Sequence, residues 1–133
     1  MENWNVVELI AFSQLCPHLD DRRYQTRIVG VDFSEQDISN ANLSAFTFVD
    51  CDFTDAIMRN VCLNYATFEG CEFVNTDLSD ADCRHVSWDE RTLKWLRDWG
   101  AKLTNACVSD YDVENYPTLQ YFWQDRGGEV ETD

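Results

Sequence analysis

Two short motifs in this sequence combine the side chains that bind structural zinc. A cysteine precedes a histidine by two positions at Cys16 and His18, and again at Cys83 and His85. Thiolate and imidazole groups form such a site when four of them meet in a tetrahedral arrangement. A zinc site therefore requires a fold that brings these two distant pairs together.

The sequence has none of the short motifs that carry common enzymatic chemistry. It contains no glycine-rich phosphate loop, no H-E-x-x-H and no G-x-S-x-G, and it has only five glycines. Carboxylates are plentiful, but catalysis needs an acid/base pair or a nucleophile that converges on a pocket. We predict a protein that is not an enzyme and that holds neither a cofactor nor a metal.

The spacing of the large apolar residues predicts the element that must position these side chains. From Val31 to Glu90 the chain reads as consecutive five-residue units, with a large residue in the middle of nearly every unit. The central residues are Phe33, Ile38, Leu43, Phe48, Phe53, Met58, Leu63, Phe68, Phe73, Leu78, Cys83 and Trp88. The residue two positions earlier is mostly small, and the others are mostly polar. A period of five fits neither a helix nor a strand, so we expect one large and one small side chain inside each unit.

This pattern resembles the pentapeptide-repeat family, whose motif is a small residue, Asp or Asn, Leu or Phe, Ser or Thr, and a variable residue. The resemblance covers about 60 of the 133 residues. It implies an all-β fold, a right-handed quadrilateral β-helix (a pentapeptide-repeat solenoid) of three to four coils with N-terminal and C-terminal capping helices. A solenoid buries a continuous core only by stacking its repeats on their neighbours.

Four units per coil would place residues that are 20 positions apart directly above one another, at roughly 4.8 Å. At this period the aromatic and aliphatic centres separate into columns, which supports the fold independently. The expected columns are Phe33, Phe53 and Phe73; Phe48, Phe68 and Trp88; Ile38, Met58 and Leu78; and Leu43, Leu63 and Cys83. Gln36 and Phe46 depart from the small inward position, and the ends of the repeat are expected to be irregular.

The same geometry decides between two interpretations of the cysteines. It turns Cys83 inward and His85 outward, which argues against zinc. It also stacks Cys51 on Cys71 at a distance that would permit a disulfide. Their side chains would run parallel in two inward slots, so two packed, reduced thiols are the favoured interpretation.

The flanking segments are suited to covering the open ends of the stack, so we divide the chain at residues 1–30, 31–90 and 91–133. Helical spacing of apolar residues that include Trp4 and Ile10 predicts a helix over residues 3–15. A second helix is expected over residues 88–99, with a capping box between Ser87 and Glu90 and a stop at Gly100. Its apolar face would hold Leu93, Leu96 and Trp99.

Beyond this helix, two interpretations of residues 101–115 stay open. Either they form a partial fourth coil with Leu103, Val108 and Val113 inside, or the repeat has ended. Tyr121, Phe122 and Trp123 either seal the last coil or form a subunit contact in a homodimer, and the final GGEVETD is expected to be disordered.

The charge of the chain is strongly negative and is concentrated in the repeat. The chain has 25 acidic and 10 basic residues, for a net charge of −15; residues 31–90 carry 13 acidic against 2 basic residues. Phosphate contacts need Lys and Arg, so direct binding to nucleic acid is not expected and a cationic protein surface is the predicted partner.

At period 20 the acidic residues gather on one edge of the predicted solenoid. Thr47, Thr67 and Ser87 leave another side nearly neutral. The predicted partner-binding residues are Asp32, Glu35, Asp37, Asp52, Asp55, Glu72, Asp77 and Asp80. Regular columns of negative charge would offer a DNA-binding groove a substitute for the phosphate backbone. An equally open interpretation is that outward Asp residues simply keep a small solenoid soluble.

Within the pentapeptide-repeat family, proteins of the Qnr and MfpA type are acidic rods that look like DNA and protect gyrase. This chain resembles them in fold and charge, although it is shorter. The resemblance implies binding to a DNA-processing enzyme of the gyrase or nuclease type. Because the chain is short, a useful mimic would need an end-to-end dimer. The competing hypothesis is a structural scaffold that binds partners through exposed apolar and aromatic residues, including Ile57, Tyr65, Val74 and the aromatic residues of the C-terminal tail.

The N-terminus has no basic segment before its short apolar stretch, and no run of 18 uncharged apolar residues occurs. We therefore expect a soluble cytoplasmic protein that does not enter a membrane.

Overall fold

The structure is a computed structural model, and it describes residues 27–132. The helix expected over residues 3–15, with Trp4 and Ile10, lies outside the described residues, as do Cys16 and His18 of the first cysteine–histidine pair.

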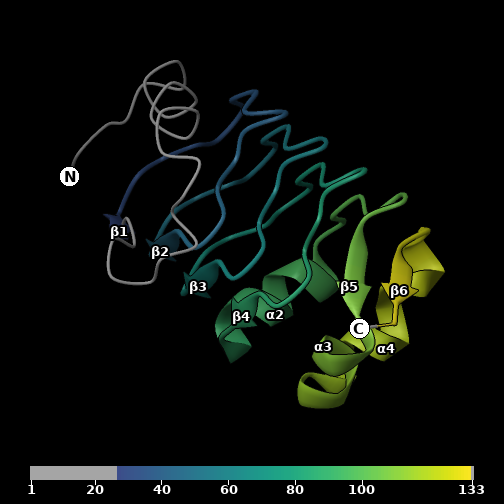
Figure 1. Ribbon diagram of the computed structural model, residues 1–133. Helices are drawn as coiled ribbons and strands as arrows, with labels where there is room; N and C mark the ends of the chain where they lie inside the picture. Colours follow the sequence, from purple (N-terminus) through teal and green to yellow (C-terminus); the bar gives the residue numbers. More distant parts are fainter. Residues whose placement is uncertain (1–26, 133) are drawn as a thin grey trace.

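One side of the repeat is a parallel sheet of very short strands. These are β1 (Arg27–Val29), β2 (Thr47–Val49), β3 (Thr67–Glu69) and β4 (Ser87–Trp88), in the order β1-β2-β3-β4. The register pairs Ile28 with Phe48, Phe48 with Phe68, and Phe68 with Trp88. Each strand therefore lies beside the strand that begins 20 residues later, and Figure 1 shows the levels following one another from β1 to β4.

The other sides of the repeat keep the same register through single bridges. Asp32 pairs with Asp52 and Asp52 with Glu72; Asp37 pairs with Ile57 and Ile57 with Asp77; Asn42 pairs with Cys62 and Cys62 with Asp82. Four five-residue units thus separate each bridged residue from its partner. The prediction that residues 20 apart lie one above another is confirmed, and the β-solenoid fold with it.

The last residue of each unit turns the chain, and it does so with a positive φ angle. Left-handed backbone is costly for most residues and is tolerated best by Gly, Asn and Asp. The described corners are mostly of these types, including Asn40, Asp50, Asp55, Asn60, Gly70, Asn75 and Asp80. Gly70 suits its corner because of its φ of 62°, and a Cβ atom there would also require the carboxylate of Asp50, at 2.5 Å, to move aside.

The central residues of the units form the core that was predicted. The ring centroid of Phe53 lies 5.1 Å from that of Phe33 and 5.0 Å from that of Phe73, with nearly parallel planes. Phe68 stacks in the same way between Phe48 and Trp88, at 5.2 Å from each. The two columns meet edge to face, an arrangement that aromatic rings favour.

The small inward positions hold Cys51 and Cys71 as free, buried thiols, which confirms the interpretation as reduced cysteines. Each thiol donates to a backbone carbonyl, Cys51 to that of Ile28 at 3.5 Å and Cys71 to that of Phe48 at 3.3 Å. Of the two departures from the motif, Phe46 is buried, while Gln36 is exposed and does not enter the core.

Helix α2 (Glu90–Asp98) interrupts the repeat after β4. The expected capping box at Ser87 is wrong: the N-cap is Asp89, whose side chain accepts from the N–H of Thr92 at 2.9 Å, and Ser87 belongs to β4. Leu93 and Leu96 are buried as predicted. Trp99 is not, because the helix ends before it, and 53% of its surface is exposed.

The register resumes after α2, because Lys102 bridges to Asp77 and Cys107 to Asp82. Leu103 and Val108 are buried, as the partial-coil interpretation expected. The repeat then ends, because β5 (Cys107–Ser109) leads directly into helix α3 (Asp110–Asn115). The predicted inward position of Val113 is therefore wrong, and this residue is half-buried on α3.

The C-terminal segment is ordered as far as residue 132, which corrects the expectation of a disordered end. Helix α4 (Pro117–Phe122), the 3-10 turn η2 (Gln124–Arg126) and strand β6 (Glu129–Glu131) follow α3, and β6 pairs in parallel with β5. The indole N–H of the buried Trp123 donates to the carbonyl of Ala106 at 2.9 Å. Figure 1 shows α3, α4 and β6 gathered at one end of the stack.

None of the helices within residues 27–132 is both long and apolar enough to span a bilayer.

Candidate functional site

Five carboxylates form a continuous surface on one side and corner of the repeat, which we call the acidic wall. Its members are Asp32, Asp52 and Glu72, which pair in register, and Glu35 and Asp55, which occupy the adjoining corner. The parallel bridges hold the backbones of the first three residues at successive levels. The spacing of the charges is thus set by the strand spacing, roughly 4.8 Å per level.

Local hydrogen bonds hold the aspartates of the acidic wall in place. The Oδ1 atom of Asp32 accepts from the N–H of Ser34 at 2.9 Å. In the next level Oδ1 of Asp52 accepts from both the N–H of Thr54 at 2.9 Å and its hydroxyl at 2.6 Å. Hydrogen bonds from Ser34 lower the pKa of Asp32, so this carboxylate is ionised throughout the neutral range.

The acidic wall is not neutralised by its surroundings. No Lys or Arg within residues 27–132 forms an ion pair with any of its five carboxylates. Asp55 has only a neutral partner, the side-chain amide of Asn75, which donates to Oδ1 at 2.8 Å. The wall therefore presents net negative charge to the solvent.

The adjoining side, which carries Asp37, Asp77 and Asp80, differs from the expectation of a second acidic surface. Asp77 is only 7% exposed, and its Oδ2 atom accepts from Nε of Arg59 at 2.6 Å. Lys102 lies in register with Asp77 on the next level. Burial opposes the ionisation of Asp77, but hydrogen bonds from Ser79 and Arg59 outweigh it and lower the pKa.

The sequence analysis did not predict that Arg59 would pair with Asp77, although the spacing of the two residues indicates it. Arg59 follows the centre of its unit and Asp77 precedes the centre of its own, 18 residues later. At a period of 20 these two positions lie on neighbouring levels of one side. Asp37 and Asp80 stay exposed there, and Arg59 reduces the net charge of this side by one.

The remaining sides hold fewer carboxylates in register. Thr47, Thr67 and Ser87 pair in register along the sheet, where Glu69 and the corner residue Asp50 are exposed carboxylates. On the side of Asn42 and Cys62, the carboxylate of Asp82 is bound by Arg84, with Nη2 to Oδ2 at 2.8 Å. The acidic wall differs from these sides because its carboxylates follow one another on successive levels.

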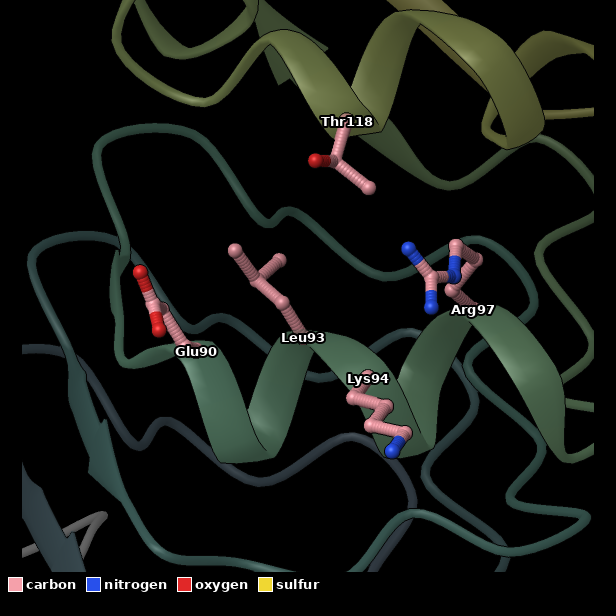
Figure 2. Close-up of a pocket in the computed structure, with 5 residues that line it drawn as sticks. All are labelled: Glu90, Leu93, Lys94, Arg97 and Thr118. Atoms are coloured by element: carbon pink, nitrogen blue, oxygen red, sulfur yellow. The ribbon is translucent and has the colours of Figure 1, made fainter.

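Positive charge gathers instead on α2. A pocket of about 280 Å³ is lined by Glu90, Leu93, Lys94, Arg97 and Thr118. Figure 2 shows Leu93 and Arg97 rising from α2 toward Thr118 on α4. Arg97 binds the neighbouring Asp98, with Nε to Oδ1 at 2.8 Å. The pocket brings together no nucleophile or acid/base pair of the kind that catalysis requires.

The aromatic residues expected at a cap or a dimer contact divide into two groups. Phe122 and Trp123 are buried and cover the end of the stack. Tyr121 on α4 and Trp99 after α2 point outward, and 76% of the Tyr121 surface is exposed. Only the second group is available to a partner.

The second cysteine–histidine pair does not converge. Cys83 is fully buried, while the ring of His85 stacks on that of Tyr65 at a corner. Within the part of the chain that the structure describes, no three His, Cys, Asp or Glu side chains lie close enough to hold a metal ion.

Known proteins share the repeat and the fold described above. The sequence model of the pentapeptide repeats matches in eight copies, over residues 26–64, 37–73 and 56–87. None of the curated proteins has a sequence significantly similar to this chain.

Among solved structures, alr5209, a pentapeptide repeat protein from Nostoc Pcc 7120, is 16% identical with a TM-score of 0.59, over 98% of this chain and 99% of its own. A trypsin-treated form of QnrB1, a plasmid-mediated fluoroquinolone resistance protein, is 15% identical with a TM-score of 0.36. That match covers 81% of this chain and 51% of the QnrB1 chain.

Proposed function

This chain is a pentapeptide-repeat protein, and on that premise we propose that its acidic wall binds a DNA-processing enzyme, of the gyrase or nuclease type, at the cationic groove that otherwise holds DNA. The observation that carries this proposal is the alignment of Asp32, Asp52 and Glu72 in one register without a cationic partner among the described residues. The protein would act as an inhibitor or protector of that enzyme.

The spacing and rigidity of the acidic wall support this function. Duplex DNA carries one charge per roughly 1.7 Å of its axis, and a DNA-binding groove matches that charge with Lys and Arg. Like charges stacked at roughly 5 Å repel one another, so the alignment costs stability. A cationic partner would relieve this repulsion, and the hydrogen bonds that hold Asp32 and Asp52 reduce the ordering that binding requires.

The proposed shape is a right-handed quadrilateral β-helix of three to four coils with a capping helix at each end, divided at residues 1–30, 31–90 and 91–133. Three to four coils span only roughly 14 to 19 Å at the strand spacing, about half a turn of duplex. An end-to-end homodimer would lengthen the charged surface, and the exposed Trp99 and Tyr121 are its proposed contacts. We place the protein in the cytoplasm, where such enzymes act.

The test is a competition between this protein and duplex DNA for purified gyrase and for a panel of nucleases. Inhibition should be competitive with DNA and should weaken as the salt concentration rises, because screening reduces the attraction between exposed charges. The triple variant Asp52→Asn, Asp55→Asn, Glu72→Gln should inhibit at least tenfold less. Asn retains the acceptor oxygen for the hydrogen bond from Thr54.

A matched control removes the same number of charges elsewhere. Glu114, Asp125 and Glu129 are exposed and lie outside the repeat, so Glu114→Gln, Asp125→Asn, Glu129→Gln changes the net charge equally without touching the acidic wall. Equal inhibition by the two triple variants would refute the proposal, because net charge alone would then explain the binding.

The second candidate function is a structural scaffold that binds a protein through exposed apolar side chains. Ile57 and Tyr65 are exposed at outward positions where the repeat motif is usually polar. This interaction would be insensitive to salt and would be lost in the variant Ile57→Thr, Tyr65→Asn. A partner captured equally well at low and high salt, and lost with this variant, would favour the scaffold over DNA mimicry.

In both functions the protein acts by binding and not by catalysis. The acidic wall lies on the outside of the repeat, and none of its residues lines the pocket on α2 described above, which supports a non-enzymatic role.

A further inference from the structure

We propose that the pocket bounded by Tyr65, His85, Tyr111, Asp112 and Tyr116 binds the guanidinium group of an arginine side chain from a protein partner. This pocket of about 240 Å³ lies away from the acidic wall, at another corner of the repeat. The inference deepens the proposed function, since it gives the cationic partner a specific anchor, but its test does not depend on finding that partner.

The pocket is built around a ladder of aromatic rings. Tyr65 and His85 are 20 residues apart, and their ring centroids lie 5.1 Å apart with an interplanar angle of 8°. Tyr111, from α3, continues the ladder at 5.8 Å from His85. Tyr116 closes another side, and its hydroxyl accepts from the N–H of Trp88 at 3.3 Å.

The residue types at this corner are unusual for its backbone. Tyr65 and His85 have φ angles of 62° and 63°, whereas most of the other described corners use Gly, Asn or Asp. A left-handed conformation is less favourable for tyrosine than for these types, whereas histidine tolerates it better. The corner position places both rings on the outside of the repeat, stacked on neighbouring levels.

A buried anion completes the pocket. Asp112 is only 1% exposed, and its carboxylate accepts hydrogen bonds from the N–H of His85, at 2.9 and 3.1 Å, and from the N–H and hydroxyl of Ser109. Among the residues that the structure describes, no Lys or Arg forms an ion pair with Asp112. The pocket is thus lined by aromatic rings and by a carboxylate that pairs with no Lys or Arg among the described residues.

This combination fits a planar organic cation. A cation is attracted to the face of an aromatic ring, and arginine both stacks on rings and donates hydrogen bonds to carboxylates. The nearby cation Arg84 is already bound, to Asp82 at 2.8 Å and Glu131 at 3.5 Å, so it does not fill this role. Tyr65 and Tyr111 are 47% and 56% exposed, so a partner's side chain can reach the pocket from solvent.

The test measures the binding of small probes to the full chain by nuclear magnetic resonance titration. N-acetylarginine methylamide should shift the signals of Tyr65, His85 and Tyr111. The matched citrulline derivative, which keeps the shape but lacks the charge, should bind at least about tenfold more weakly. The phenylalanine derivative tests for an aromatic occupant instead.

Two variants locate the site and avoid the fold-critical Asp112. Tyr111→Leu and Tyr65→Asn should each weaken arginine binding by roughly three- to tenfold, and Asn suits the left-handed corner. Val29→Thr, which changes an exposed side chain outside the pocket's lining, is the control and should bind arginine like the parent chain. Circular dichroism checks that each variant is folded.

Equal binding of the arginine and citrulline derivatives, tighter binding of the phenylalanine derivative, or arginine binding unaffected in both folded ring variants would each overturn the inference. The outcome is separable from the proposed function. Arginine that fails to bind while inhibition of a DNA-processing enzyme persists removes only this pocket; arginine that binds while no enzyme is inhibited removes only the DNA-mimic function.

Discussion

Nε of Arg59 lies 2.6 Å from Oδ2 of Asp77, across two neighbouring levels of the repeat. Asp77 is nearly buried, whereas most of the Arg59 side chain is exposed. The pair makes this side less negative than the acidic wall, whose five carboxylates form no ion pair with Lys or Arg among the described residues.

The first prediction concerns the pH dependence of this pair. Against the effect of burial, hydrogen bonds from Ser79 and Arg59 hold the pKa of Asp77 in the folded state below its ordinary value of roughly 3.9. The pair therefore stabilises the fold above that pH, and the effect is lost as the pH falls through the lowered pKa. Arg59→Met should therefore lower stability to urea at pH 7, and the difference from the parent chain should shrink toward pH 3. Arg97→Met, whose partner Asp98 is exposed, should have a smaller effect at pH 7. If the stability difference between Arg59→Met and the parent chain stayed the same from pH 7 to pH 3, the ionised Asp77 would not be the partner through which Arg59 stabilises the fold.

The second prediction concerns the reactivity of Cys107. Burial, together with the nearby carboxylate of Asp82, raises the pKa of this thiol to about 12. Because the thiolate is the reactive form, only about one molecule in ten thousand would carry it at pH 8. Iodoacetamide should therefore label Cys107 slowly in the folded protein, and the rate should rise about tenfold per pH unit between pH 7 and 9.

Peptide mapping by mass spectrometry measures this rate, and the protein in urea provides the control in which burial is removed. Labelling of Cys107 at the same rate in the folded and unfolded chains would show that its environment does not raise the pKa.

The third prediction concerns the left-handed corners. Glu35 is an exposed corner residue with a φ of 60°, which costs more for glutamate than for glycine. Glu35→Gly should therefore be more stable than Glu35→Gln by about 0.5–1 kcal/mol. The Gln variant controls for the loss of charge, since it keeps the unfavourable backbone angle. Urea denaturation measures the stability of both variants. If Glu35→Gly were less stable than Glu35→Gln, the positive φ angle at this corner would not be a cost that glycine relieves.

The fourth prediction concerns the stacked core. The buried ring of Phe53 lies between those of Phe33 and Phe73 and meets the ring of Phe48 edge to face at 5.4 Å. Phe53→Ala should lower the free energy of unfolding by about 3–5 kcal/mol, because the removed ring leaves a cavity that its neighbours cannot fill. Val29→Thr, at an exposed site, should change it by less than about 0.5 kcal/mol. A loss below about 1 kcal/mol for Phe53→Ala would mean that the columns do not form one packed core.

Several features of the fold follow from the sequence because each depends on a periodic pattern. A large residue every five positions requires a chain that turns inward at that interval, and the separation of aromatic from aliphatic centres at period 20 fixes the register. Phe33, Phe53 and Phe73 could therefore be assigned to one column before any coordinates were known. The left-handed corners also have a sequence pattern, because Asn, Asp and Gly recur at the fifth position of the units.

The structure of the C-terminal segment at the end of the stack could not be predicted from local sequence patterns, because it depends on long-range contacts. The segment GGEVETD is polar and rich in glycine, which indicates disorder, yet Glu129–Glu131 pairs with β5. Gly128 lets the chain pass close to Trp123 just before β6, because any other residue would place a Cβ atom 2.3 Å from the ring of Trp123. The pairing satisfies an open strand edge of the solenoid, and the edge exists only once the coils have stacked.

The sequence by itself determined the repeat, the core columns and the excess of negative charge, since these are properties of composition and period. Only the tertiary structure decided which charges remain unpaired. Whether a carboxylate meets a cation depends on which side chains face each other across levels: Arg59 reaches Asp77, while the acidic wall receives no such partner among the described residues. The tertiary structure also gathered Tyr65, His85, Tyr111 and Asp112 from the repeat and α3 into one pocket, because their proximity arises from stacking and from the return of the chain after α2.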